Sequence, residues 1–186
     1  MFVPFAPSGA YDSIATTTVG AGGTSTITFS SIPATYTHLQ LRGIARTSAG
    51  GNSDFVVVRF NSDSGANYSR HAVVGSGAGT YTEAEANATN VRFDPAAASG
   101  ATTSVFGVGV IDILDYANTS KYKTTRNLSG FDNNGVGTNP WDKGFIQLAS
   151  GNWRSTSAVS TITLTSGNGG NFVQYTQFAL YGIKGA

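Results

Sequence analysis

The stretch TSVFGVGVIDIL, residues 103–114, decides the fold class of this chain. Apolar side chains occupy both alternating faces of its centre, and Gly107 and Gly109 leave room for a close neighbour. Short apolar runs rich in β-branched residues are typical of buried strands. We therefore expect a central strand that is covered on both sides.

Two-residue alternation continues on either side of this stretch. Ile27 and Phe29, for example, share one face of residues 25–30, and threonines occupy the other. The pattern predicts about ten strands, at residues 13–19, 25–30, 38–46, 55–60, 68–74, 103–114, 121–128, 144–149, 159–165 and 172–183. Turns rich in Gly, Asn and Ser separate them, and only residues 82–88 resemble a short helix. We predict an all-β fold, an antiparallel β-sandwich with jelly-roll-like topology.

The length of 186 residues fits a single domain, which we place at residues 11–186. Residues 1–10 are predicted to form an extended N-terminal arm, because two prolines interrupt the opening MFVPFAP. No Lys or Arg precedes the apolar residues of this opening, and such a pattern is untypical of a secretory signal or transit peptide. The arm could lie in a groove of its own domain or dock onto a neighbouring subunit. Its expected anchors are Phe2, Val3 and Phe5.

The composition is neutral and polar. Charged residues are 11% of the chain, whereas roughly 25% is usual. Gly, Ser, Thr and Asn together account for 80 residues, and the net charge is +1. This balance gives no electrostatic reason to bind nucleic acid or an anionic membrane. Small neutral groups do suit wide contacts between subunits, so we expect a homo-oligomer, with a trimer favoured.

Motifs for catalysis or metal binding are not apparent. The chain lacks cysteine, a Gly-x-Ser-x-Gly elbow and a His-Glu-x-x-His pair, and its two histidines, His38 and His71, fall in predicted strands. The neighbours Glu83 and Glu85 are assigned to a solvated loop. We therefore expect no catalytic residue, cofactor or metal ligand, and a protein that is not an enzyme.

Two segments faintly resemble calcium loops, at residues 61–67 and 131–135. Each contains a single carboxylate, whereas calcium sites commonly supply several. A hairpin turn explains the first segment adequately. The basic stretch containing Lys121, Lys123 and Arg126 is interpreted as protection of an edge strand.

The two tryptophans flank the predicted strand at residues 144–149. A glycan platform could form from Trp141 and Trp153 with the neighbouring Asp142 and Asn152, because exposed rings beside polar groups suit a pyranose. The other interpretation, which we favour, is that both rings cap the core or fill a subunit interface.

Several stretches of the chain resemble a family of small virion proteins of tailed bacteriophages. They are ITFSSIPATYTHLQLR (27–42), RFNSDSGANYS (59–69), IDILDYANTSKYK (111–123) and FALYGIK (178–184). The resemblance extends over most of the chain from Tyr11 onward. Proteins of this family are described mostly as tail or structural components, so no catalytic residue is carried over. The resemblance implies a virion component that is assembled in the host bacterial cytoplasm.

Two functions follow as expectations. The first is a capsid cement or decoration protein, which binds the outside of the phage head, with the major capsid protein as its partner. The alternative is the head domain of a tail fibre or adhesin that binds host surface glycans. The first would use the N-terminal arm, and the second would use the tryptophans.

Overall fold

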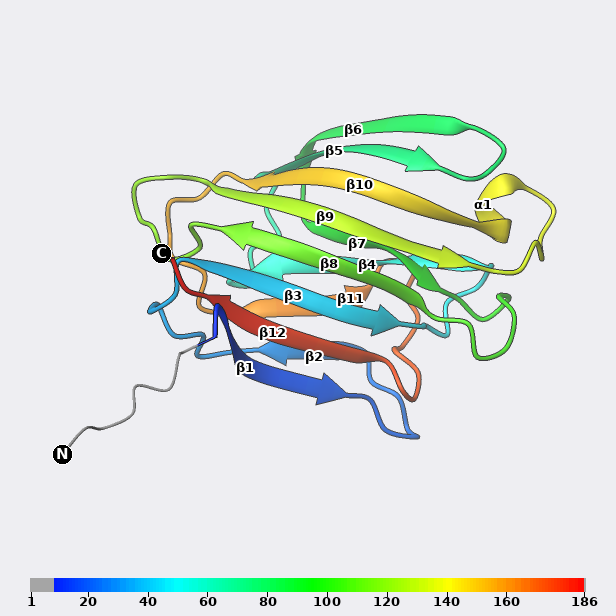
Figure 1. Ribbon diagram of the computed structural model, residues 1–186, viewed down its shortest axis with the longest axis horizontal. Helices are drawn as coiled ribbons and strands as arrows, with labels where there is room; N and C mark the ends of the chain where they lie inside the picture. Colours follow the sequence, from blue (N-terminus) through cyan, green and yellow to red (C-terminus); the bar gives the residue numbers. More distant parts are fainter. Residues whose placement is uncertain (1–8, 186) are drawn as a thin grey trace.

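Two antiparallel sheets face each other in the computed structural model, which describes residues 9–185 (Figure 1). The large sheet has the order β1 (Tyr11–Thr18), β12 (Gln177–Ile183), β3 (His38–Ala45), β8 (Gly107–Leu114), β9 (Lys123–Asp132), β10 (Gly144–Trp153), β5 (Tyr68–Gly75) and β6 (Thr80–Ala88). The small sheet has the order β2 (Thr26–Phe29), β11 (Ile162–Ser166), β4 (Ser53–Phe60) and β7 (Val91–Ala97). The predicted all-β antiparallel sandwich is confirmed.

The chain crosses repeatedly between the two sheets. Consecutive strands β2, β3, β4 and β5 alternate between them, whereas β8, β9 and β10 form a meander inside the large sheet. A jelly roll has eight strands, and the described residues form twelve. The jelly-roll topology therefore stays a prediction.

The hydrophobic core lies between the sheets and is rich in aromatic rings. Phe60, Tyr68 and Trp153 contact one another near one end of the sandwich, with ring centroids 5.7–6.3 Å apart. Phe93 and Phe178 meet edge to face at 5.3 Å in the same cluster. These large rings fill the space between the sheets and fix their separation.

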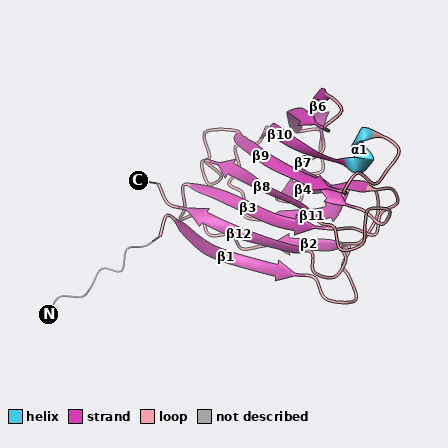
Figure 2. Cartoon of the chain, turned by 45° about the vertical axis from the view of Figure 1, so that its right-hand side comes forward, coloured by secondary structure: helices cyan, strands magenta, loops and turns pink. Residues whose placement is uncertain are grey.

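Residues 82–88 were expected to be helical, and that prediction is wrong, because they belong to strand β6 (Figure 2). Glu83 and Glu85 lie on one face of this strand, where both carboxylates bind Arg70, at 2.8 and 3.1 Å. An isolated stretch this short gains little from helix formation, so pairing with β5 and these ion pairs decide its conformation. The glutamates are therefore not in a solvated loop.

Lys123 was predicted to protect an edge strand, but it begins β9, which pairs with β8 and β10 on its two sides. Its side chain is fully buried. The ammonium donates to the carbonyl oxygens of Asn118 and Lys121, at 2.6 and 2.9 Å. Burial lowers the pKa of Lys123, and these bonds tie the preceding loop to the strand.

The edge of the small sheet lies close against the inner face of the large sheet. A Cβ atom on Gly107 would lie 2.2 Å from the carbonyl oxygen of Pro95 in β7, so only glycine fits there. The Asn127 amide donates to the Arg92 carbonyl at 2.8 Å, and the Ser129 hydroxyl donates to the Asp94 carbonyl. The close approach expected at this glycine is confirmed. Side chains of β9 therefore donate hydrogen bonds to carbonyl groups at the edge of β7, which a neighbouring strand would otherwise do.

Candidate functional site

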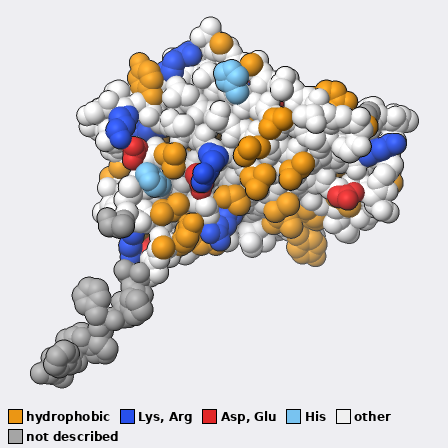
Figure 3. Space-filling model, turned by 45° about the horizontal axis from the view of Figure 1, so that its top comes forward, with side chains coloured by type: hydrophobic (Ala, Val, Ile, Leu, Met, Phe, Trp, Pro, Cys, Tyr) orange, Lys and Arg blue, Asp and Glu red, His pale blue; other side chains and the backbone are white. Residues whose placement is uncertain are grey.

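The outer face of the large sheet carries a contiguous group of aliphatic side chains, which we call the outer aliphatic patch. Each comes from one of the five strands β3, β8, β9, β10 and β5, and six of them are 42–60% exposed. The patch consists of Ile44, Val73, Val108, Val110, Leu128, Ile146 and Leu148. Figure 3 shows hydrophobic side chains crossing this face as a band.

Strand register aligns the patch in two rows across the sheet. Ile44 is opposite Val108, and Ile146 follows in the same row beyond Gly130. The second row runs through Val110, Leu128, Leu148 and Val73, each directly opposite the next. Directly opposite side chains on one face contact each other, so the patch is continuous.

Glycines leave an open hollow of about 930 Å³ beside the first row. Gly130 lies between Val108 and Ile146 in the register, and Gly75 lies opposite Ile146 on the other side. Neither glycine has a side chain to fill its place in the row. The outer face therefore has both protruding aliphatic side chains and a recess that aliphatic side chains line.

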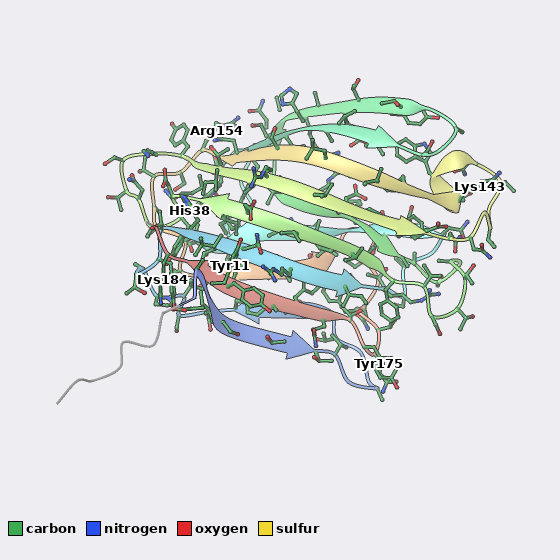
Figure 4. The ribbon with its side chains drawn as sticks, viewed as in Figure 1. Tyr11, His38, Lys143, Arg154, Tyr175 and Lys184 are labelled. Carbon is green, nitrogen blue, oxygen red and sulfur yellow. The ribbon has the colours of Figure 1, made fainter. Side chains whose placement is uncertain are left out.

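The patch ends at a polar row toward the His38 end of the sheet, which lies opposite the Lys143 end in Figure 4. Asp112 accepts from the guanidinium of Arg126 at 2.6 Å and from the amide of Gln40 at 2.7 Å. Two of the charges beside the patch, those of Asp112 and Arg126, are therefore paired within the chain.

At the β1 edge, the guanidinium of Arg42 lies over the rings of Tyr11 and Tyr181, at 5.1 and 4.7 Å from their centroids. Tyr11 is labelled in Figure 4. The cation is thus held against this edge of the sheet by aromatic faces rather than by a carboxylate.

Strand β8 was expected to be covered on both sides, and that prediction is wrong for the described chain. Its inner face is buried under β7, but Val108 on the outer face is 58% exposed. The apolar character of both faces was read correctly from the sequence. Nothing within residues 9–185 covers the second one.

A separate small pocket of about 210 Å³ lies near the short helix α1 (Pro140–Lys143). The carboxylates of Asp54, Glu83 and Asp94 line it with the rings of Trp141 and Phe145. Desolvation by burial raises the pKa of Asp94 to about 7, although nearby Arg92 opposes this shift. The pocket therefore combines an aromatic wall with acidic groups, one of which takes up a proton near neutral pH.

The four residues of the predicted glycan platform do not come together. Trp153 is only 2% exposed and donates from its indole nitrogen to the Asp63 carboxylate at 2.7 Å. Trp141 lies just before the opposite end of β10, whose ten residues span about 30 Å. Asp142 completes the capping box of α1, in which its carboxylate accepts from the side chain of the N-cap residue Asn139, and Asn152 lies beside Trp153. Trp153 belongs to the core, as the favoured interpretation expects.

The other sequence-based candidates have the following places. Phe2, Val3 and Phe5, the expected anchors of the arm, lie outside the described residues. In the first calcium-like segment, the Asp63 carboxylate accepts from the Trp153 indole and from the Gly65 amide at 2.8 Å, and these bonds lower the pKa of Asp63.

Among residues 9–185, no three His, Cys, Asp or Glu side chains are grouped to hold a metal ion. Within the same range, no helix has the length and apolar character needed to cross a membrane.

Comparisons of this chain with protein-family models, with curated proteins and with solved structures found no match.

Proposed function

We propose that the protein is a structural component of a tailed-bacteriophage particle, and specifically a cement or decoration protein on the outside of the head. The outer aliphatic patch is the observation that carries this proposal. Exposed aliphatic groups in this number mark a surface that is covered when the protein is at work. The resemblance of the sequence to small virion proteins supplies the kind of particle.

The rest of the surface suits the same role. Small neutral side chains can be buried in wide contacts at low cost when they are hydrogen-bonded. A subunit that binds only the assembled shell stabilises that shell by mass action. The major capsid protein is the proposed partner, and the N-terminal arm with Phe2, Val3 and Phe5 is the proposed attachment. The protein would then be located in the virion.

Deleting residues 1–7 tests the attachment. We expect the shortened chain to keep its β-rich circular dichroism spectrum and to lose binding to heads that lack this protein. Substituting Phe2 and Phe5 by Ser should have the same effect with less change to the chain. Unchanged occupancy of heads by the shortened chain would contradict the proposed attachment.

The number of copies per particle tests the location. A stained gel of purified virions should show hundreds of copies for a decoration protein. A few tens of copies or fewer would instead place the chain in a tail appendage and reject the decoration role.

A tail-fibre or adhesin head domain that binds host glycans is the second candidate. The observation that favours it is the pocket near α1, where Trp141 stands beside the carboxylates of Glu83 and Asp94. Trp141→Ala should then abolish retention on a glycan array without loss of folding. Trp153→Ala is not a suitable variant, because it removes a core side chain. A wild-type protein that retains no glycan would reject this candidate.

A further inference from the structure

The distribution of polar and apolar groups in the middle of the large sheet is inverted. In β9 the buried face carries Thr125, Asn127 and Ser129, whereas the exposed face carries Leu128. In β10 the buried face carries Gln147, between the exposed Ile146 and Leu148. An antiparallel sheet with one solvated side ordinarily shows the reverse. The outer face has the composition of a surface that is buried against another molecule.

We infer that the outer aliphatic patch binds the same patch on a second copy of this chain, with the two large sheets packed face to face. This inference concerns the chain alone and does not depend on its place in a virion. It assigns the surface through which the expected homo-oligomer forms.

The outer face of the large sheet is large enough for a stable contact between two copies. Eight strands at about 4.8 Å spacing and eight residues at about 3.3 Å give the whole outer face, of which the patch is the centre, a footprint of about 1,000 Å². A standard interface buries about 800 Å² on each partner. Aliphatic groups occupy its middle and polar groups its side, as in interfaces with a dry centre and a wet rim.

Charge does not oppose the contact between two copies. The patch contains no ionisable side chain, and the neighbouring Asp112 and Arg126 are paired within one chain. Each chain has a net charge of only +1, so two copies repel each other weakly. Arg42 lies opposite Val110 at the end of the second row, where the Tyr11 and Tyr181 rings and the Gln40 side chain hold its guanidinium.

The outer face offers a second copy both protruding side chains and a recess. Val108 and Ile146 protrude on either side of the recess at Gly130, and a second copy turned by half a rotation presents the same arrangement. The protruding groups of one copy can thus enter the recess of the other. An isologous contact needs this kind of self-complementarity.

The experiment measures the mass of the full chain in solution by light scattering and sedimentation at micromolar concentration. We expect twice the chain mass of 19.2 kDa for the wild type, because an isologous contact closes with two copies. Leu148→Lys should weaken the association at least about tenfold, because it places an unpaired charge in the middle of the contact. Leu128→Thr should weaken it less.

The matched control is Tyr122→Lys. Tyr122 is 54% exposed, close to the 52% of Leu148, and lies before β9 beyond the polar row. This variant should assemble like the wild type, and circular dichroism should show all three variants folded. A wild type that stays monomeric, or a Leu148→Lys protein that stays assembled, would overturn the inference.

The same measurement separates this surface from the arm. A chain without residues 1–8 should assemble normally. Loss of assembly in that chain, with Leu148→Lys still assembled, would overturn the inference by assigning the contact to the arm. The proposed role in the virion is tested on particles, so each idea can fail without the other.

Discussion

Strands β3 and β12 differ from β9 and β10 in how they use their two faces, although all four belong to one sheet. In β3, Leu39 and Leu41 face the core, and Arg42 faces solvent. In β9, Asn127 faces the interior, and Leu128 faces solvent. In each region, the structure that covers the inner face of the sheet determines whether the buried side chains are apolar or polar. Large rings of the core cover β3, whereas β9 is covered by the edge of β7, whose carbonyl groups accept hydrogen bonds from β9 side chains.

The comparison teaches that burial and hydrophobicity are separate properties in this sandwich. Where a backbone edge lies against the sheet, the buried residues must be small or must donate hydrogen bonds. The hydrophobic residues displaced from that face appear on the outer one, where they are available to another molecule.

Gly107→Ala should have the largest effect, because it adds a methyl group where β7 lies closest. The new Cβ atom would lie 2.2 Å from the Pro95 carbonyl oxygen, so one of the two backbones must shift. We expect the free energy of unfolding to fall by about 3 kcal/mol or more in urea denaturation. Gly20→Ala, with no atom within 4 Å of its added Cβ, is the control and should be nearly neutral. Equal effects of the two would show that β7 is not held closely.

Asn127→Leu makes the buried face of β9 more hydrophobic, yet it should destabilise the protein. The variant leaves the Arg92 carbonyl without its donor at 2.8 Å, in a buried place. We expect a loss of about 2 kcal/mol in the free energy of unfolding. A stabilising Asn127→Leu would mean that this face behaves like an ordinary core, and the contrast with β3 would disappear.

Asp94→Asn should change how stability depends on pH. The folded state keeps the Asp94 proton up to a pH near 7, whereas the pKa of a solvated aspartate carboxyl is 3.8. The unfolded chain therefore binds fewer protons between these values, and the free energy of unfolding of the wild type falls as the pH rises through this window.

The Asn variant lacks this titration. Its stability advantage over the wild type should be larger by about 1–2 kcal/mol at pH 8 than at pH 5, since the partly exposed site reduces the full effect. Asp132→Asn, at an exposed position of β9, serves as the control. Urea denaturation at both pH values provides the measurement. An advantage that does not grow with pH would show that the Asp94 carboxyl is not desolvated.

Leu128→Asn should have the smallest effect on the folded monomer, because Leu128 is already 54% exposed. We expect less than about 0.5 kcal/mol in dilute solution. The midpoint of wild-type thermal unfolding should rise with protein concentration, and that of the variant should rise less. A loss of several kcal/mol at high dilution would make Leu128 part of the monomer core instead.

Much of the fold could be predicted from two-residue periodicity alone. The predicted strands at residues 25–30 and 38–46 correspond to β2 and β3, because Ile27 and Leu41 face an ordinary hydrophobic core. Strand β7 was missed, since Arg92, Asp94 and Pro95 interrupt its alternation. Its place depends on donors from β9, which no local pattern contains.

The candidate site was harder to predict than the fold. Alternation shows that Leu128 and Asn127 face opposite ways, but it does not show which face is covered. Hydrophobicity alone would favour burial of Leu128, whereas the position of β7 places Asn127 on the buried face. The tryptophans are a similar case, because Trp141 and Trp153 flank one strand in sequence while its length keeps them apart. The sequence shows that both faces of β8 are apolar, and on that basis its exposed aliphatic residues were predicted to be covered.

The separation of the two indole rings gives the protein two natural optical reporters. Trp153, enclosed by Phe60 and Tyr68, should emit at short wavelength and follow the opening of the sandwich. Trp141, beside Tyr81 and Phe145, should respond instead to whatever enters the neighbouring pocket. A chain with Trp153→Phe would therefore make occupancy of that pocket visible by fluorescence, without an added label.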